Sequence, residues 1–590
     1  MKKKFLFAGM IVLSLLASLF TPSAALFVKT SADRTSKSSS SPIGPFSFQG
    51  AEPVSEFLDA DLSISSDLVE IGDRSPIYKC GDISTDTTWV ADTYVLTCTV
   101  NILSGFTLTI ESGAVIKAYT EEFYGNVYGL QVYGTLSATG TESQPIVFTS
   151  LRDDTFGGDT NNDADATSPG VGNWTRIGVY SGGSATLDHV LIRYAGGSLH
   201  TQSQESIRNA GGSLSLHNST IEFGGGSAIR SDTNGLIDIQ DSLIQNNSEH
   251  GLYYSASGSV APIIKNNTFT SNNSYAIYFN IPGPLTLDGT QMDVNTALTN
   301  GTNGLRLSGT LAGTSTLSGD LGFPYVLEGT TYISPGSTLT IEPGAVFKAY
   351  TEEIYGNVYG LQVGGTLSAT GTESQPIVFT SLRDDTYGGD TNNNLDGNTP
   401  AAGHWTRVAV DATGSATLDH VLIRYAGGSL HTQSQESLLN NGALTLLHML
   451  IEHSGGVGLR MIAGTLNVHS SEFFHNSSGI WLGTSSSAVS IVDSDFLGNT
   501  AGIYFAGNFP PEIINCIFEG NTLWGVINSM GFDITAMHNW WGSRSGPTHP
   551  SNPTGTGDPV SDRVIFAPWL AARPRCLGSC SIFLPMILQP

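Results

Sequence analysis

The chain has 590 residues, of which only 13% are charged and 69 are glycine, and its formal net charge is −26. This composition is unlike that of a disordered polyelectrolyte and favours an all-β protein with many turns. The negative charge argues against nucleic acid as a partner, because contacts to a phosphate backbone require the opposite sign.

The N-terminus has the pattern of a secretory signal. Three lysines precede the apolar run FLFAGMIVLSLLASLF, and Ser23 to Ala25 offer a small-residue cleavage site. A single membrane anchor is the alternative, since the run approaches the length of a membrane span. We predict a signal peptide over residues 1–25 and a serine-rich linker over 26–76. The protein is then expected to be secreted or held at the cell surface, with no membrane span after cleavage.

The rest of the chain contains an internal duplication. Residues 107–209 recur at 338–440 without a gap, so that TLTIESGAVIKAY returns as TLTIEPGAVFKAY. Such self-similarity is typical of stacked repeat architectures. We therefore predict one unit over 77–300 and a second over 301–570 that includes a C-terminal cap, followed by a tail over 571–590.

Short coils of similar plan fill the remainder of each unit. Segments such as STIEFGGGSAIR, SEFFHNSSGIWL and SDFLGNTAGIYF place a short apolar strand before Asn, Gly or Ser and a second apolar strand. Their apolar residues alternate with polar ones, which is the period of a strand and not of a helix. Asparagine at the bends suits left-handed backbone conformations. The pattern predicts parallel strands stacked coil upon coil around an apolar column.

The motifs GTLSATGTESQPIVFTSLRDDTYGGDTN, ATLDHVLIRYAGG and NWWG…GP…GDPVSDRVIFAPWL resemble those of bacterial secreted and surface proteins with a right-handed parallel β-helix, the pectate-lyase-like superfamily. The resemblance covers about residues 78–570. It implies an all-β fold, a single-stranded right-handed parallel β-helix. It does not specify function, because the superfamily includes polysaccharide lyases, glycoside hydrolases and adhesins.

The cysteines suggest one disulfide. Cys80 and Cys98 lie at the start of the first unit, and the second unit has Gly329 in place of Cys98 and no match to Cys80. Their joint absence predicts that they pair. Cys576 and Cys580 are candidates for a second small loop, and Cys516 in the apolar strand IINCIF is expected in the core.

Two acidic loops carry the strongest chemical pattern. LRDDTFGGDTNNDADAT and LRDDTYGGDTNNNLDGN place side-chain oxygens at alternate positions, as a calcium ion requires. Ala164 and Leu395 stand where an EF-hand loop has glycine, and no bidentate glutamate follows, so a solvated loop held by Asx turns is the alternative. Aspartates of the preceding turn (Asp153, Asp154, Asp384 and Asp385) could join. The candidate ligands are Asp159, Asn161, Asp163 and Asp165, and Asp390, Asn392, Asn394 and Asp396.

A polar segment, SLHTQSQES, is identical in both units. Its side chains offer a hydrogen-bonding face, which is weak evidence for a binding surface because a recent duplication would also leave it unchanged. The candidate residues are His200, Gln202, Gln204 and Glu205, and His431, Gln433, Gln435 and Glu436.

No catalytic constellation stands out. The pairs Asp188-His189 and Asp419-His420 have no nucleophile-elbow motif nearby, and the histidines are expected to be turn residues. The leading hypothesis is a non-catalytic binding or adhesion-type protein that recognises extracellular polysaccharide or a cell-surface component. One alternative is a calcium-assisted polysaccharide lyase or glycoside hydrolase that uses Arg193 or Arg424. Another is a structural spacer.

Overall fold

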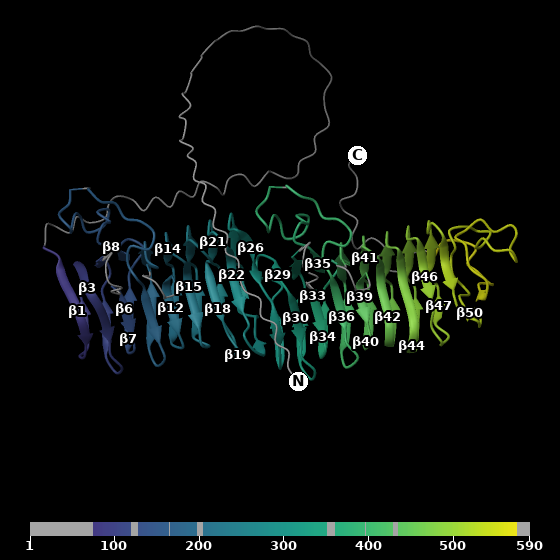
Figure 1. The fold of residues 1–590 in the computed structure, drawn as a ribbon, viewed down its shortest axis with the longest axis horizontal. Coiled ribbons are helices and arrows are strands. Elements are labelled where there is room, and N and C mark those ends of the chain that lie inside the picture. Colours follow the sequence, from purple (N-terminus) through teal and green to yellow (C-terminus); the bar gives the residue numbers. More distant parts are fainter. Residues whose placement is uncertain are drawn as a thin grey trace, which may run out of the picture. The chain divides into compact units, whose positions relative to one another are not determined.

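The computed structural model describes residues 75–119, 128–164, 166–197, 204–350, 360–395, 397–428 and 435–574. These residues form a right-handed parallel β-helix and contain no helix (Figure 1), so the predicted fold class is confirmed. Accordingly, no helix in the described part of the chain is long and apolar enough to cross a membrane. The signal, the linker up to residue 74, and the pair Cys576 and Cys580 lie outside the described residues.

Each coil carries three strands, which we call A, B and C in chain order, and equivalent strands of successive coils pair in parallel to form three faces. In the first unit, β1 (Ile77–Ile83) pairs with β3 (Thr93–Ile102), which spans faces A and B. Face A continues with β5 (Val115–Ala118), β8 (Ile146–Ser150), β11 (Val190–Arg193), β14 (Thr220–Glu222), β17 (Leu243–Gln245), β21 (Thr268–Thr270) and β25 (Thr296–Leu298). Face B continues with β6 (Leu130–Val132), β9 (Ile177–Tyr180), β12 (Glu205–Ala210), β15 (Ser227–Asp232), β18 (Leu252–Ser255), β22 (Tyr275–Asn280) and β26 (Thr302–Arg306). Face C contains β2 (Thr87–Trp89), β4 (Thr107–Ile110), β7 (Thr135–Thr139), β10 (Ser184–Asp188), β13 (Ser213–His217), β16 (Leu236–Gln240), β20 (Ile263–Lys265) and β24 (Met292–Asp293).

The second unit repeats this plan. Its face A contains β29 (Tyr325–Leu327), β32 (Val346–Ala349), β35 (Ile377–Ser381), β38 (Val421–Arg424), β41 (Leu450–Glu452), β43 (Glu472–Phe474), β45 (Asp495–Leu497) and β48 (Ile517–Glu519). Face B contains β30 (Thr330–Ile333), β33 (Gly360–Val363), β36 (Arg407–Val410), β39 (Glu436–Asn440), β46 (Ala501–Phe505) and β49 (Trp524–Asn528). Face C contains β28 (Thr314–Leu317), β31 (Thr338–Ile341), β34 (Thr366–Thr370), β37 (Ser415–Asp419), β40 (Ala443–Leu447) and β47 (Glu512–Ile514). The long strands β42 (Val457–His469) and β44 (Ser478–Val492) span faces B and C.

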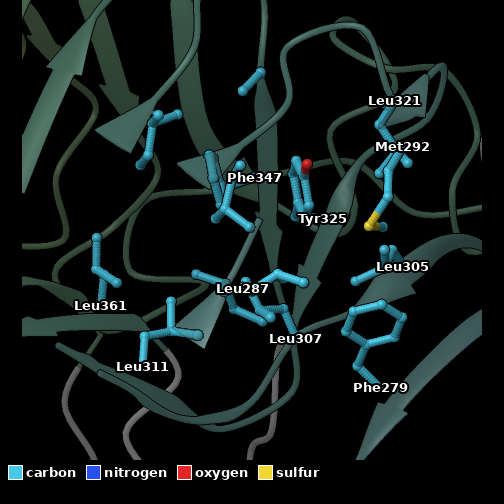
Figure 2. Close-up of a cluster of buried hydrophobic side chains, with 14 of the residues drawn as sticks. Phe279, Leu287, Met292, Leu305, Leu307, Leu311, Leu321, Tyr325, Phe347 and Leu361 are labelled. Carbon is cyan, nitrogen blue, oxygen red and sulfur yellow. The ribbon is translucent and has the colours of Figure 1, made fainter. Parts of the chain in front are cut away.

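The two units join without a break in the stack, but the faces shift by one position at the junction. β26 of face B pairs with β29, which belongs to face A of the second unit. A fourth strand, β19 (Gly258–Val260), enters the coil and is followed by β23 (Leu285–Leu287) and β27 (Gly309–Leu311), which leads into β30. Buried Leu305, Leu307 and Tyr325 belong to the apolar core, which is continuous through the junction (Figure 2). The structure therefore shows stacked coils, and not a flexible hinge, around 300–325.

The interior is a continuous apolar column in which equivalent side chains of successive coils stack. The ring centroids of Phe473 and Phe496 are 5.1 Å apart, and those of Phe496 and Phe518 are 5.0 Å apart. Buried Trp541 extends this stack at 4.8 Å from Phe518. These spacings match the separation of paired strands, about 4.8 Å. The tryptophan-rich segment therefore covers the last coil, where its short strands β50 (Ile534–Thr535) and β51 (Val564–Ile565) pair.

Single residues in the left-handed conformation turn the corners on either side of face A. Examples are Asn218, with a φ of 49°, before β14 and Asn246, with a φ of 55°, after β17. Asparagine, aspartate and histidine tolerate this conformation better than most residues. The expectation that asparagines occupy left-handed bends is confirmed at these positions.

The residue after a left-handed corner often has a second role, because its side chain points inward and bonds to the next coil. Asn499 donates its Nδ2 to Phe473 O at 2.9 Å and to Asn521 Oδ1 at 3.1 Å, while its Oδ1 accepts the Asn476 backbone N–H at 2.9 Å. Asn521 ends this ladder by donating to Asp558 Oδ2 of the cap, at 2.6 Å. The ladder thus satisfies buried polar groups that would otherwise oppose folding.

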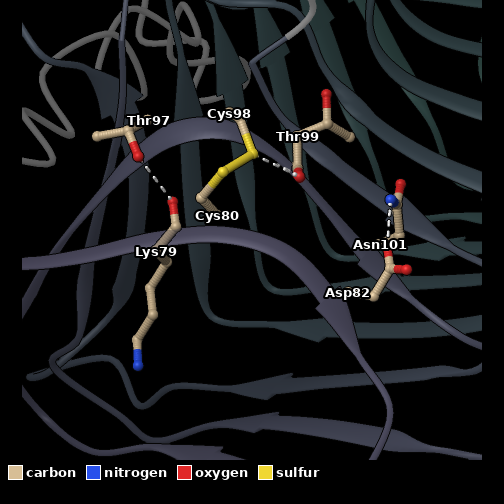
Figure 3. Close-up of a disulfide and its surroundings, with 7 residues drawn as sticks. All are labelled: Lys79, Cys80, Asp82, Thr97, Cys98, Thr99 and Asn101. Atoms are coloured by element: carbon tan, nitrogen blue, oxygen red, sulfur yellow. Dashed lines mark hydrogen bonds between the residues drawn. A yellow bond between two sulfur atoms is a disulfide. The ribbon is translucent and has the colours of Figure 1, made fainter.

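The opposite end of the described coils is held by the predicted disulfide. Cys80 of β1 and Cys98 of β3 are bonded, with their Cα atoms 4.9 Å apart (Figure 3), which confirms the pairing. The side chain of Asn101 also donates to Asp82 across the same strands at 2.8 Å. Cys516 is a fully buried free thiol, as expected of a core residue.

The ladder gives a first prediction. Asn499→Leu keeps the number of side-chain heavy atoms but removes the hydrogen-bond partner of buried groups on the two neighbouring coils, so we expect the local opening free energy of these coils to fall by about 2–4 kcal/mol. Hydrogen exchange of the amides in β43, β45 and β48 measures this change. Asn467→Leu, at an exposed site on face C, is the matched control. Equal protection in the two variants would contradict a stabilising role for the ladder.

Candidate functional site

Face C carries a row of outward-facing polar side chains, most of them hydroxyls, which we call the hydroxyl row. Parallel pairing aligns Thr417 with Thr445, then Asn467, Ser490 and Glu512 in successive coils. The same row begins earlier in the second unit, and the first unit has its own. The further members are Thr316, Thr340 and Ser368, and Thr88, Thr109, Ser137, Thr186, Ser215 and Asp238.

The hydroxyl row lines a shallow open groove on β37, β40, β42, β44 and β47. It is lined by Ser415 and Thr465, by the five residues from Thr417 to Glu512, and by Ala416, Leu444 and Val489. Glu512 is the only charged side chain among the described residues that line it. The groove therefore offers neutral hydrogen-bonding groups at one position per coil, about 4.8 Å apart. The sequence signal for this row is the alternation in TLT, TLSAT and SATLD, which by itself predicts a strand and no binding surface.

The acidic loops fold back on themselves through the backbone. Asp159 accepts the N–H groups of Ala164 at 3.0 Å and Asp163 at 3.2 Å, and the hydrogen bond from Ala164 is the main cause that lowers its pKa. Asp390 likewise accepts from Leu395 and Asn394. Ala164 and Leu395 have φ values of 50° and 52°, so both occupy the left-handed position expected of the missing glycine. These are Asx-type turns, the alternative to a metal loop.

The first loop nevertheless gathers three carboxylates. One oxygen from each of Asp154, Asp159 and Asp163 lies within 4.8 Å of the others, so the preceding turn does contribute. Asn161 lies beside them and donates to Asp163 at 2.8 Å. In the second loop, neutral Asn394 replaces Asp163. Asp165 and Asp396 lie outside the described residues.

A buried lysine already supplies positive charge to each loop. The ammonium of Lys117 donates to Gly158 O, and that of Lys348 donates to Gly389 O. Both side chains are fully buried. Burial lowers the pKa of Lys348 to about 8, while Asp385 and Asp384 oppose this shift. Any divalent cation would therefore join a cluster whose charge is partly balanced.

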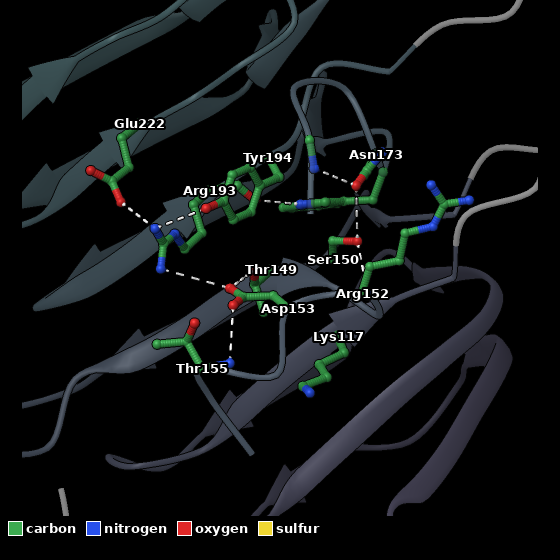
Figure 4. A network of polar contacts seen from close by, with 12 residues as sticks. Lys117, Thr149, Ser150, Arg152, Asp153, Thr155, Asn173, Arg193, Tyr194 and Glu222 are labelled. Carbon is green, nitrogen blue, oxygen red and sulfur yellow. Dashed lines mark hydrogen bonds and ion pairs between the residues drawn. The ribbon is translucent and has the colours of Figure 1, made fainter. Parts of the chain in front are cut away.

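Arg193 and Arg424 serve as structural links. Arg193 NH2 lies 3.1 Å from Glu222, NH1 lies 3.7 Å from Asp153, and Thr149 donates to the same Asp153 (Figure 4). Arg424 makes the same pairs with Glu452 and Asp384. Each guanidinium also covers the ring of the following tyrosine. These contacts tie the loop to face A and leave neither arginine extended into a groove.

The prediction that SLHTQSQES presents a polar surface is wrong for its glutamates. Gln204 and Gln435 are exposed, but Glu205 and Glu436 are completely buried. They pair with Arg176 and Arg407, which are themselves largely buried. The pairing turns each glutamate inward at the start of its strand, because a buried guanidinium requires a carboxylate partner. His200, Gln202, His431 and Gln433 lie outside the described residues.

Comparison with known families agrees with this architecture. A model described as "Right handed beta helix region" matches residues 177–368 and 387–541, and one described as "Pectate-lyase like beta helix domain" matches 81–209 and 309–442. The chain therefore belongs to the right-handed β-helix family. No curated protein and no solved structure matched it.

The buried lysine gives a prediction about pH. Folded Lys348 releases its proton at a pH of about 8, whereas the unfolded chain holds it up to about 10.5, so stability from this group rises with pH between these values. The rise is on the order of 3 kcal/mol. The Lys348→Met variant should not show this rise in stability. The pH dependence of hydrogen exchange in β32 and β35 measures the difference. Lys265→Met, at a partly exposed site, is the control. A Lys348→Met profile parallel to the wild type would refute the shift.

Proposed function

We propose that the protein is a non-catalytic binding rod, secreted or held at the cell surface, that recognises a neutral extracellular polysaccharide along face C. The observation that carries this proposal is the groove with the hydroxyl row, from Thr417 to Glu512. A polymer of sugars presents hydroxyl groups at a regular interval, and the row presents partners at a regular interval of about 4.8 Å. Weak contacts repeated over several coils, and in two units, add up through avidity.

Charge favours a neutral polymer over a polyuronate. The chain has a net charge of −26, and the described residues that line the groove include no cation. A polyanion would approach against this charge, by the same argument that disfavours nucleic acid. Arg193 and Arg424, the residues for a lyase, are paired with carboxylates and stacked on tyrosines. These contacts weigh against the lyase or hydrolase alternative.

Binding to the polymer is tested with a panel of soluble neutral polysaccharides and polyuronates in affinity electrophoresis. We expect retardation by a neutral polymer, weakened by more than about 10-fold in the variant Thr417→Val, Thr445→Val, Asn467→Leu. The double variant Thr268→Val, Thr270→Val, on face A, is the control. Chain cleavage, detected as new reducing ends or unsaturated products, would instead establish the enzymatic alternative. If the triple variant were retarded as strongly as the wild type, the groove would be excluded as the polysaccharide-binding site.

We further propose that the acidic loops bind calcium weakly as structural ions. Asp154, Asp159 and Asp163 supply oxygens within 4.8 Å of one another in the first loop, and the second loop has one carboxylate fewer. Ligand charge is one determinant of calcium affinity, so the first loop should bind more tightly. The buried lysine beside each cluster keeps both affinities low.

Calorimetric titration decides this proposal. We expect heat from the first loop at lower calcium concentration than from the second, with loss of the tighter component in Asp159→Ala and of the weaker one in Asp390→Ala. Calcium should also raise the melting temperature according to its concentration. No binding up to millimolar calcium would reduce the loops to Asx turns.

A further inference from the structure

The corner between faces C and A brings together two histidines and an aspartate in the second unit. Asp419 ends β37, His420 follows it at the corner, and His448 occupies the corner of the next coil. Asp419 Oδ1 lies 2.7 Å from His420 Nδ1 and 2.8 Å from His448 Nδ1. All three ligand atoms lie within 4.8 Å of one another.

The backbone explains why the imidazoles converge. His420 and His448 both have left-handed φ values, 51° and 49°, so their side chains leave successive coils in the same direction. Their rings stack at a centroid distance of 4.5 Å. The Nδ1 atoms of both rings therefore face the one carboxylate between them.

The carboxylate forms a hydrogen bond with only one of the two rings, because His448 Nδ1 bonds to Asp419 Oδ1 at 2.8 Å whereas His420 does not. The Nδ1 atom of His420 is buried and makes no hydrogen bond, although Asp419 Oδ1 is only 2.7 Å away. The carboxylate oxygen is thus close to this nitrogen without lying where an N–H would meet it.

We propose that Asp419, His420 and His448 form a binding site for a divalent transition metal such as zinc. Two imidazole nitrogens and a carboxylate oxygen are ligands that zinc takes, whereas calcium prefers oxygen alone. Tetrahedral zinc sets its ligand atoms about 3.3 Å apart, so each imidazole needs to open from the carboxylate by about half an ångström. The side chains are 18 to 33% exposed, so solvent can supply the remaining ligand.

The first unit provides a natural comparison. Its corner has Asp188 and His189, but Asn218 stands where the second unit has His448. There His189 Nδ1 makes a hydrogen bond to Asp188 at 2.9 Å, and the amide of Asn218 donates to the same oxygen at 2.9 Å. The amide nitrogen of Asn218 has no lone pair for a metal, whereas His448 offers an imidazole nitrogen at the same position, and both donors of the first corner are satisfied by the carboxylate. The site is thus specific to the second unit and independent of the proposed polysaccharide groove.

Cobalt titration of the full chain at about pH 7.5, where imidazole is mostly neutral, tests the proposal. We expect one tight equivalent with the visible absorption of nitrogen-ligated Co²⁺, displaced by Zn²⁺. His448→Asn, which copies the first unit, should weaken this equivalent by more than about 100-fold, beyond what loss of a supporting residue causes. His189→Asn is the matched control and should leave it unchanged.

The reverse substitution sharpens the test. Asn218→His supplies the third ligand to Asp188 and His189, so this variant should bind two equivalents. Circular dichroism and melting temperature confirm that each variant is folded. A wild type without the absorption, a His448→Asn variant that retains it, or an Asn218→His variant without a second equivalent would each overturn the proposal.

Discussion

The left-handed corner residue is the constraint on which the structure depends. Each coil must turn sharply between short strands, and in most coils from β11 onward a single residue with positive φ makes this turn on either side of face A. Glycine, asparagine, aspartate and histidine tolerate this conformation best and occupy many of these corners, although Tyr194, Phe223, Val294 and Tyr425 adopt it too. The corners are consequently rich in groups that hydrogen-bond or bind metals, for a reason that begins in the backbone.

Stacking converts these single residues into columns. Because parallel strands are about 4.8 Å apart, equivalent side chains of neighbouring coils touch. Inside the coils this gives the aromatic stacks and the ladder that passes from Asn476 to Asp558. Outside, it gives the hydroxyl row on face C and the histidine pair at the corner. One substitution, Asn218 in the first unit against His448 in the second, changes the chemistry of a corner without changing its shape.

Buried charges in this protein hold loops to the coil body. Lys117 and Lys348 lie beneath the acidic loops, and Arg193 and Arg424 link the start of each loop to a glutamate one coil further along. A buried charge without a partner is costly, so each of these groups specifies one loop position. The same pairing keeps these four cations from the surface, and the described residues that line the groove on face C include no cation. That distribution is the main reason to connect face C with neutral polymers.

The sequence by itself determined the repeat, the alternation of apolar residues and the pairing of Cys80 with Cys98, because each depends on spacing along the chain or on comparison of the two copies. It also indicated that asparagines turn the corners. Only the tertiary structure decided which side chains of neighbouring coils these corner residues contact. The approach of His448 to Asp419 joins residues of different coils, and the sequence pattern does not reveal which side chains stack. The inward position of Glu205 likewise depends on Arg176, which reaches it through folding and not through proximity in sequence. The shift of faces at β26 and β29 arises from an added strand, β19, whose effect appears only once the coils are stacked.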